Sequence, residues 1–385
     1  MGDTVNKAIS KNRVSSVIVV AAISAAAMGQ CEPTLLGSYD TPGGAAGVFV
    51  SGTTAFVADW YSGGLQIIDV TDPTQPVLLG SYDTPGQAAS VFVSGNTAFV
   101  ADRSRGLLII NVTDPTQPKL LGSYNTPGSA EDVVISGTTA FVADGIVGGL
   151  QVIDITDPTQ PKLLGSYNTP DLAHSVTVVG TTAYVADRES GLQIIDVTDL
   201  TQPVLLGSYN TPGAAFGVFV SNTTAFVADS WVGGLQIISV TNPTQPTLLG
   251  SYDIQSYTWS VFVSGTTAFV ASRPGGLQVI DVTDLTQPAL LSSYDTPDWA
   301  QGVFVSGTTA FVADWDSGLQ IIDTSGCLSS CPADLNDDGL LDFFDLQVFL
   351  NWYSAGDLQA DLIADGILDF FDVQEYLNLY SAGCP

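Results

Sequence analysis

Residues 37–86, "GSYDTPGGAAGVFVSGTTAFVADWYSGGLQIIDVTDPTQPVLLGSYDTPG", return to their own opening words before they end. The tyrosine of "GSY", which reads "SSY" in the last copy, marks seven copies of this unit, spaced alternately by 43 and 42 residues. These tyrosines are Tyr39, Tyr82, Tyr124, Tyr167, Tyr209, Tyr252 and Tyr294. A sustained period of this length indicates one repeat architecture and not several unrelated domains.

Each copy contains four short apolar or alternating runs, "AGVFVSG", "TTAFVAD", "GLQIIDV" and "PVLLGSYD", separated by turn residues rich in Gly, Pro, Asp and Thr. Four strands in 42 or 43 residues predict one blade of a β-propeller. A solenoid is the alternative, but solenoids normally have shorter periods and distinct caps. We therefore expect an all-β, seven-bladed propeller over residues 30–327, with four antiparallel strands in each blade.

The ends of the repeat region complement each other. The first copy begins with a fourth strand, "PTLLGSYD" at 33–40, and the last copy stops after a third strand, "GLQIID" at 318–323. If the N-terminal strand completes the last blade, the ring closes and no sheet edge is left exposed at the seam.

Two cysteines flank this seam. When the copies are aligned, Cys31 falls at the position of Thr74 and Cys327 at the position of Pro73. These positions are neighbours in an uninterrupted turn, so we expect a disulfide between Cys31 and Cys327.

The repeat resembles a known family. The segments "LQIIDVTDPTQPVLLGSYDTPG" (65–86) and "LQVIDITDPTQPKLLGSYNTP" (150–170) are similar to the LVIVD repeats of exported bacterial and archaeal propeller proteins, although this chain has Leu-Gln-Ile-Ile-Asp in place of Leu-Val-Ile-Val-Asp. The resemblance covers about residues 33–323 and implies a secreted or surface β-propeller with no established activity.

The N-terminus has the composition of a signal peptide over residues 1–29. Lys7, Lys11 and Arg13 precede an apolar run at 14–28 that is shorter than the roughly 20 residues of a membrane span. A short buried helix is the alternative. Export predicts a secreted or cell-surface protein and oxidising conditions, in which four cysteines form two disulfides.

Composition excludes some partners. Hydrophobic residues make up 45% of the chain and charged residues 12%, so most of the chain is expected to be ordered. The formal net charge is -30, with no basic segment. Such a surface repels phosphate backbones, so no nucleic-acid partner is expected.

The copies differ mainly in the loops of one face. The turns between the first and second and the third and fourth strands hardly vary, whereas the loops of the opposite face carry five of the six tryptophans and four of the six lysines and arginines after residue 29. Aromatic side chains in exposed loops suit the binding of sugar rings or peptide side chains, although unrestrained drift of loop residues is the alternative. The expected ligand-binding residues are Trp60, Tyr61, Arg103, Arg105, Glu131, His174, Arg188, Phe216, Trp231, Trp259, Arg273, Trp299 and Trp315.

One aligned column precedes each first strand and is expected to ring the mouth of the central channel. It reads Ala46, Ala89, Glu131, His174, Phe216, Trp259 and Gln301. A second column ends each second strand and is expected to cap its own Gly-rich turn through carboxylate–amide hydrogen bonds rather than to bind cations. It reads Asp59, Asp102, Asp144, Asp187, Asp229, Ser272 and Asp314.

The pattern assigns no catalytic residue. His174 is the only histidine, and its aligned positions hold Ala, Glu and Phe, so a polar residue at the channel mouth is favoured over a general base. No Ser-His-Asp cluster, Cys-His pair or Gly-rich phosphate loop is present in the sequence. A non-enzyme is therefore expected, with a polysaccharide hydrolase or lyase as the alternative.

The C-terminal region contains two Asp-rich loops. The first, "DLNDDGLLDFFD" at 334–345, places oxygen ligands at the calcium positions of a 12-residue loop, with Gly339 at the tight turn. The second, "DLIADGILDFFD" at 361–372, has Ile363 where a third ligand is needed, which predicts a weaker site. The expected ligands are Asp334, Asn336, Asp338, Leu340, Asp342 and Asp345, then Asp361, Asp365, Ile367, Asp369 and Asp372, with Leu340 and Ile367 contributing carbonyl groups.

Each loop is followed by a helix-like stretch, and the pair resembles a GC-type, type I-like dockerin over residues 331–385. An acidic amphipathic tail without metal is the alternative. The resemblance implies a small α-helical module that binds two calcium ions and docks onto a cohesin-like or surface-anchoring protein. The residues implied in docking are Phe343, Phe344, Phe370 and Phe371.

These boundaries predict a linker at 328–332 and a calcium module at 333–385. Cys331 and Cys384 bracket the module and are expected to form its disulfide, because a domain of this size seldom stands on its own core. Processing of Cys384 for anchoring is the alternative. The chain is therefore interpreted as an exported, non-catalytic binding or structural propeller held to a surface or complex by its tail. The alternative is a polysaccharide-active enzyme or its accessory subunit.

Overall fold

The computed structural model describes residues 31–230, 232–327, 335, 343–355, 360, 372–374, 376–377 and 380, with only the backbone described at 343, 344 and 355. The expected signal peptide (1–29), the expected linker (328–332) and most of both expected calcium loops lie outside these residues. Within the described ranges, no helix has the length and apolarity needed to cross a bilayer.

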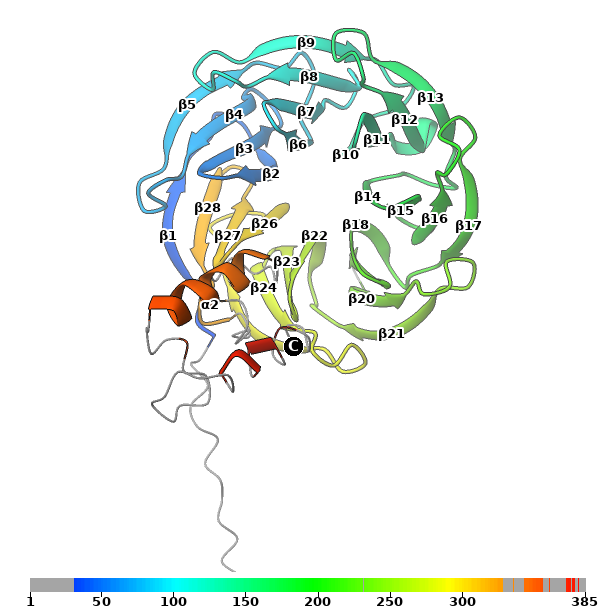
Figure 1. Ribbon diagram of the computed structural model, residues 1–385. Helices are drawn as coiled ribbons and strands as arrows, with labels where there is room; N and C mark the ends of the chain where they lie inside the picture. The colour runs from blue at the N-terminus through cyan, green and yellow to red at the C-terminus, as the bar shows by residue number, and fades with distance from the viewer. Residues whose placement is uncertain are drawn as a thin grey trace, which may run out of the picture. The chain divides into compact units, whose positions relative to one another are not determined.

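Seven four-stranded antiparallel sheets surround a central axis as a propeller (Figure 1), as the repeat predicts. Blade 1 has β2 (Ala45–Ser51), β3 (Thr54–Asp59), β4 (Gly64–Asp69) and β5 (Val77–Tyr82). Blade 2 has β6 (Ser90–Ser94), β7 (Thr97–Ala101), β8 (Leu107–Asn111) and β9 (Lys119–Tyr124). Blade 3 has β10 (Asp132–Ser136), β11 (Thr139–Ala143), β12 (Leu150–Asp154) and β13 (Lys162–Tyr167), with the short α1 (Gly145–Gly148) between β11 and β12.

Blade 4 has β14 (Ser175–Val179), β15 (Thr182–Ala186), β16 (Leu192–Asp196) and β17 (Val204–Tyr209). Blade 5 has β18 (Ala214–Ser221), β19 (Thr224–Ser230), β20 (Gly234–Ser239) and β21 (Thr247–Tyr252). Blade 6 has β22 (Tyr257–Ser264), β23 (Thr267–Arg273), β24 (Gly276–Asp281) and β25 (Ala289–Tyr294). Blade 7 has β26 (Gly302–Ser306), β27 (Thr309–Ala313), β28 (Leu319–Asp323) and β1 (Thr34–Tyr39).

The predicted closure of the ring is confirmed. Strand β1 pairs with β28 in antiparallel register, from Thr34 opposite Asp323 to Tyr39 opposite Leu319. The predicted disulfide between Cys31 and Cys327 is also confirmed and links chain positions 296 residues apart. The first strand of the chain is therefore the outer strand of the last blade.

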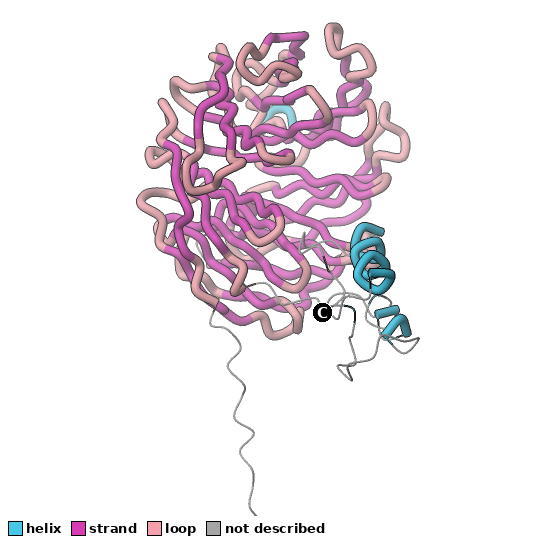
Figure 2. Tube along the Cα trace, turned by 60° about the vertical axis from the view of Figure 1, so that its left-hand side comes forward, coloured by secondary structure: helices cyan, strands magenta, loops and turns pink. Residues whose placement is uncertain are grey.

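The hydrophobic core lies between neighbouring blades. Successive residues of a strand point to opposite faces of its sheet, so Ile67 packs in a cluster with residues of blade 2, while Ile68 packs with residues of blade 7. Figure 2 shows the strands of neighbouring blades stacked side by side. Because both faces of each middle strand are covered, these strands are continuous apolar runs in the sequence.

The repeated turns have a packing role. A Cβ atom on Gly80 would lie 2.4 Å from the carbonyl oxygen of Pro115, in the Asp-Pro-Thr-Gln-Pro turn of the next blade. That turn is itself held by Asp114, whose Oδ1 accepts hydrogen bonds from the backbone N and the Oγ1 of Thr116. The glycine of "GSY" and the turn that touches it are therefore repeated together.

The C-terminal region contains α2 (Phe343–Ala355), which includes the helix expected after the first Asp-rich loop. Residues 372–374, 376–377 and 380 are also helical, in the stretch expected after the second loop. A small apolar cluster forms around the buried side chains of Phe349, Ala360 and Tyr376.

The seam disulfide generates a stability prediction. Replacing Cys31 and Cys327 together by Ser is expected to lower the free energy of unfolding by about 2–5 kcal/mol, because the cross-link restricts the unfolded chain. Chemical denaturation of the protein, followed by tryptophan fluorescence, measures the change. An unchanged denaturation midpoint in the double variant would contradict a stabilising role for this bond.

Candidate functional site

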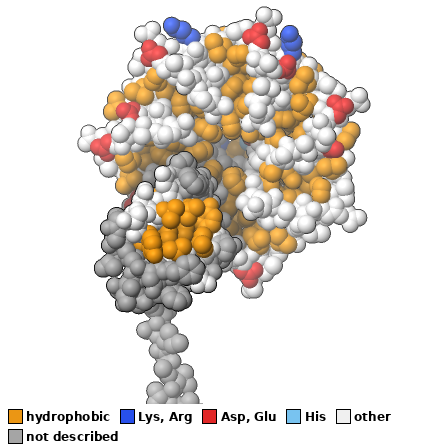
Figure 3. Space-filling model, in the orientation of Figure 1, with side chains coloured by type: hydrophobic (Ala, Val, Ile, Leu, Met, Phe, Trp, Pro, Cys, Tyr) orange, Lys and Arg blue, Asp and Glu red, His pale blue; other side chains and the backbone are white. Residues whose placement is uncertain are grey.

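The innermost strands of all seven blades enclose a central cavity of about 260 Å³. Figure 3 shows the central hollow on one face of the ring, with acidic side chains toward the outer edge. The lining includes every member of the predicted mouth column, which is thereby confirmed: Ala46, Ala89, Glu131, His174, Phe216, Trp259 and Gln301.

A row of phenylalanines narrows the channel beyond this mouth. Neighbouring rings in the row lie 4.9–5.2 Å apart between centroids. The row runs through Phe92, Phe49, Phe304, Phe262 and Phe219. It is interrupted in blades 3 and 4, where Val134 and Thr177 line the channel instead. The polar side chains of Glu131, His174 and Gln301 therefore lie at the mouth, whereas the phenylalanine row makes much of the deeper lining apolar.

The loops between second and third strands project side chains over the next blade. Arg103 and Ala130 exchange two backbone hydrogen bonds of 3.1 Å, and Arg188 is bonded to Ala215 in the same way. Both arginines have left-handed backbones, with φ of 40° at Arg103 and 37° at Arg188. Such a conformation is uncommon for residues with a Cβ and is found most often at functional sites, so it points to a functional role for these loops.

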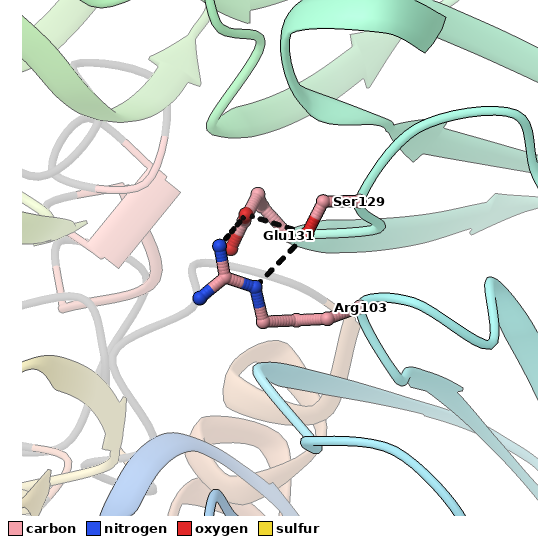
Figure 4. Close-up of polar contacts among 3 residues, drawn as sticks. All are labelled: Arg103, Ser129 and Glu131. Atoms are coloured by element: carbon pink, nitrogen blue, oxygen red, sulfur yellow. Dashed lines mark hydrogen bonds and ion pairs between the residues drawn. The ribbon is translucent and has the colours of Figure 1, made fainter.

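This pairing brings Arg103 to the mouth residue that follows Ala130. The Arg103 Nη2 lies 2.7 Å from Glu131 Oε1, and Arg103 Nε donates a 2.9 Å hydrogen bond to Ser129 Oγ (Figure 4). Ser129 Oγ in turn donates to Glu131 Oε1 at 3.0 Å. Burial raises the pKa of Glu131, and the positive charge of Arg103 opposes that rise.

His174 is held in one tautomer. Its Nδ1 lies 2.8 Å from the carbonyl oxygen of Phe216, and a carbonyl can only accept, so Nδ1 carries the proton and Nε2 is left as an acceptor. Burial, together with the positive charges of Arg188, Arg103 and Arg273, lowers the pKa of His174 to about 4, and the hydrogen bond to the Phe216 carbonyl opposes this shift. The imidazole is therefore neutral at pH 7.

The arginines stack on aromatic rings around the mouth. The Arg273 Cζ lies 3.6 Å from the ring centroid of Trp259, and the Arg188 Cζ lies 5.0 Å from that of Phe216. Phe216 and Trp259 are 4.3 Å apart between centroids, and both contact the His174 ring.

The same arrangement continues into blades 7, 1 and 2. The Arg273 Cζ lies 5.6 Å from the centroid of Trp315, Trp315 contacts Trp60 at 5.8 Å, and the Arg103 Cζ lies 4.5 Å from Trp60. We call these residues the mouth cluster: Arg103, Arg188, Arg273, Glu131, His174, Trp60, Phe216, Trp259 and Trp315. All of them were predicted as ligand-binding residues from the variable loops.

The other predicted residues of this face lie outside the mouth cluster or at its edge. Tyr61 and Trp299 are 64% and 48% exposed, which leaves much of each ring free to contact a ligand. Trp299 is 5.4 Å from the Arg273 Cζ, whereas Arg105 is exposed, with Asp102 nearby. Trp231 lies outside the described residues.

The aspartate column has a different role from the one expected. Asp59 does not cap its own turn with its carboxylate. Its two oxygens accept hydrogen bonds from Thr41 Oγ1 at 2.9 Å and from the backbone N of Gly43 at 2.8 Å, in the loop that leads into β2. Each such aspartate therefore connects two loops of the variable face. A side chain can reach a loop 16–18 residues away only once the blade has folded.

Sequence reasoning missed a polar network inside the channel. Asp132 Oδ1 accepts from Ser90 Oγ at 2.6 Å, and Oδ2 accepts from Ser175 Oγ at 3.0 Å, so one carboxylate links blades 2, 3 and 4. Burial raises the pKa of Asp132. The aligned positions hold only Gly or Ser in the other copies, and that contrast was the available signal.

Parts of the expected calcium site are described. Asp345 and Asp372, the last residues of the two loops, are both fully buried, and the Leu335 backbone N donates a 2.9 Å hydrogen bond to Asp345 Oδ1. Phe349 and Tyr376 each lie four residues further on, and their rings stack 4.3 Å apart with a 3° interplanar angle. The two repeats of this region thus pack through equivalent positions.

The remaining C-terminal predictions lie outside the described residues. These are Asp334, Asn336, Asp338, Leu340, Asp342, Asp361, Asp365, Ile367 and Asp369, the rings of Phe343, Phe344, Phe370 and Phe371, and the expected disulfide of Cys331 with Cys384.

Comparison with protein families matches the LVIVD repeat at residues 42–84, 85–126, 127–169, 172–211, 212–254, 255–296 and 299–331. The chain belongs to the LVIVD repeat family. No curated protein matches this LVIVD repeat chain in sequence.

Solved structures similar to this LVIVD repeat protein share its fold at low identity. The Pan2 WD40 domain of Neurospora crassa is 13% identical, with a TM-score of 0.61, and the match covers 77% of this chain and 96% of that one. A functionally unknown protein from Desulfotomaculum acetoxidans is 15% identical, with a TM-score of 0.61 and coverage of 72% and 95%. At this identity the likeness extends to the propeller fold alone.

The environment of His174 generates a spectroscopic prediction. Because its pKa is lowered from 6.5 to about 4, the folded protein should be destabilised as the pH falls from about 6.5 toward 4, while the imidazole stays neutral above pH 5. Nuclear magnetic resonance of ¹⁵N-labelled protein without a histidine tag reports on this residue alone, since it is the only histidine. A titration midpoint near 6.5 would contradict the buried, carbonyl-bonded tautomer.

Proposed function

We propose that this LVIVD repeat protein is an exported, non-catalytic binding propeller whose variable loop face holds a ligand over the central channel. The observation that carries the proposal is the mouth cluster, in which arginines from three blades stack on aromatic rings. Glu131, His174, Phe216 and Trp259 of this cluster also line the central cavity. The opposite face is formed by turns that hardly vary between copies, so it offers no comparable concentration of binding side chains.

The exposed rings of the same face support a ligand with flat apolar surfaces. Tyr61 and Trp299 present rigid rings that bury much area on contact while losing little conformational entropy. Glycans and peptides with apolar side chains both offer such surfaces.

The C-terminal region serves, in this proposal, as a calcium-dependent docking tail similar to a dockerin. The buried carboxylates of Asp345 and Asp372, in loops whose other expected ligands are also oxygen atoms, fit a calcium ion, which prefers oxygen. Bound calcium would supply charge that offsets the burial of these acids. The partner would be a cohesin-like or surface-anchoring protein.

Export is supported by two features. The seam disulfide of Cys31 and Cys327 suits an oxidising compartment, and residues 1–29 read as a signal peptide. We therefore place the protein outside the cell or at its surface.

The alternative function is a polysaccharide hydrolase or lyase. Two buried acids, Glu131 and Asp132, beside His174 are the observation that favours it. Glu131 is, however, engaged by Arg103, and His174 donates to a backbone carbonyl with a pKa far below that of a general base at pH 7. These contacts support binding over catalysis.

The binding face generates a mutational prediction. Replacing Tyr61 or Trp299 by Ala is expected to weaken ligand affinity about three- to tenfold each, because an aromatic contact contributes roughly 0.5–1.5 kcal/mol. A glycan and peptide array identifies the ligand, and calorimetry measures the affinities. Val77→Ala, at an exposed position on the outer strand β5, is the control and should bind normally. Equal loss in the control would contradict the assignment of this face.

The tail generates a metal-binding prediction. The mature protein is expected to bind calcium, and Asp345→Ala should weaken the tighter site at least tenfold because it removes the last ligand of the first loop. Calorimetry with calcium chloride measures both, and Asp316→Ala, at an exposed position in a propeller loop, is the control. Absence of calcium binding by the unmodified protein would remove the docking proposal.

A further inference from the structure

The mouth cluster holds positive charge that nearby acids do not balance. The chain has 39 acidic and 9 basic residues, yet within the described residues the pair of Arg103 and Glu131 is the sole ion pair. In the described part of the chain, neither Arg188 nor Arg273 has a carboxylate oxygen within 4.0 Å, although the negative charge of Asp298 acts on Arg273 from farther away. In so acidic a protein, two arginines without an acidic partner at one cavity are unexpected.

Several buried hydrogen-bond donors at the mouth have no acceptor in the described part of the chain. Four buried nitrogens there lack a partner: Nε of Arg188, Nε of Arg273, Nε1 of Trp259 and Nε2 of Gln301. All four belong to N–H donors, and Gln301 is only 8% exposed. Buried donors without acceptors are costly, so this region lacks oxygen atoms that would accept from it.

The guanidinium groups of Arg188 and Arg273 stack on two aromatic rings that contact each other. Arg188 stacks on Phe216 and Arg273 on Trp259, and the rings of Phe216 and Trp259 lie 4.8 and 5.3 Å from that of His174. Burial lowers the pKa of Arg273 to about 9, which reflects the cost of holding this charge away from water. A bound anion would offset that cost.

Acceptors for hydroxyl groups lie beside the guanidinium groups. The Nε2 of His174 is an acceptor in the tautomer fixed by the Phe216 carbonyl and has no hydrogen-bond partner in the described part of the chain. The carboxylate of Glu131 can also accept. An anion that carries hydroxyl groups on a ring would use the donors and acceptors together, and its ring faces would suit Trp299 and Tyr61.

From this geometry, and resting on the proposed binding function, we propose that the mouth cluster binds an acidic sugar residue, with the sugar carboxylate held by the Arg188 and Arg273 guanidinium groups. The planar guanidinium fork matches a carboxylate in a bidentate geometry. The cavity of about 260 Å³ is near the lower end of typical ligand sites, roughly 300–1,000 Å³, and suits one sugar ring. The hydroxyl groups of that ring would donate to His174 Nε2 and Glu131.

The test is calorimetry of the full mature chain with tri-galacturonate as the probe and its methyl ester as the neutral analogue. We expect tri-galacturonate to bind at least tenfold more tightly than the ester, with affinity that falls as salt is raised. Equal or stronger binding of the ester would overturn the assignment of the anion site while leaving a glycan-binding face intact.

Variants of the two arginines test whether their guanidinium groups contact tri-galacturonate. Arg188→Gln and Arg273→Gln are each expected to weaken tri-galacturonate binding at least tenfold, and Arg188→Lys should restore only part of the affinity because it keeps the charge but not the fork. Lys119→Gln is the control, since Lys119 is an exposed cation on the outer strand β9 and belongs to no expected binding site, and it should bind within twofold of the unmodified protein. Equal losses in all three glutamine variants would overturn the proposal.

Two further measurements check that the variants fold and test an acidic peptide as the rival ligand. Circular dichroism and thermal denaturation show whether each glutamine variant is folded. If Arg273→Gln does not fold, the affinity of Arg188→Lys for tri-galacturonate is used to test the proposal. An acidic peptide, oligoglutamate, is titrated in parallel. Arginine-dependent binding of the peptide without binding of tri-galacturonate would overturn the sugar and assign a peptide ligand. If neither probe nor the neutral ester binds, the inference fails, and the array described above tests the binding function separately.

Discussion

The antiparallel pairing of β1 with β28 is the interaction on which this structure depends. Without it, blade 7 would have three strands and an open edge, and the cluster that joins Phe311 and Leu319 of blade 7 to Ile68 of blade 1 would lose its outer cover. Because each core lies between two blades, every blade needs both neighbours. Closure therefore stabilises the whole ring and also sets the loops of one face around a common axis.

Repeated and varied residues have separate physical roles. Gly80 is repeated in six of the seven copies because no Cβ fits beside the Pro115 carbonyl, and the turn that supplies this carbonyl is repeated with it. The exception is Ser292, in the blade before the seam, where the sequence lacks that turn. The loop residues after each second strand are free to vary because hydrogen bonds to the aspartate that ends the strand fix the position of the loop. Asp59, for example, connects its loop to the one that contains Thr41 and Gly43. The scaffold thus tolerates an arginine, a tryptophan or a glycine at the same loop position.

The mouth of the channel is electrostatically unlike the rest of the protein. Arg103 is neutralised by Glu131, whereas Arg188 and Arg273 are stacked on aromatic rings, which stabilises a cation without removing its charge. The neutral imidazole of His174 adds an acceptor and no further positive charge. A ring of negative charge elsewhere would repel anions, so recognition of an anion here depends on short-range, directional contacts more than on long-range attraction.

Sequence by itself determined the blade count, the strand order, the seam, the Cys31–Cys327 disulfide and the face that carries the variable residues, because strand alternation, turn chemistry and repeat phase are local properties. It misassigned the carboxylate of Asp59 and missed the network of Asp132, since their partners lie 16–18 and about 42 residues away and meet only in the folded ring. Only the tertiary structure decided that Arg188 and Arg273 form no ion pair within the described residues and stack on rings that contact His174. Contacts between side chains of different blades depend on closure of the ring and on the directions of the side chains, and neither follows from the repeat period.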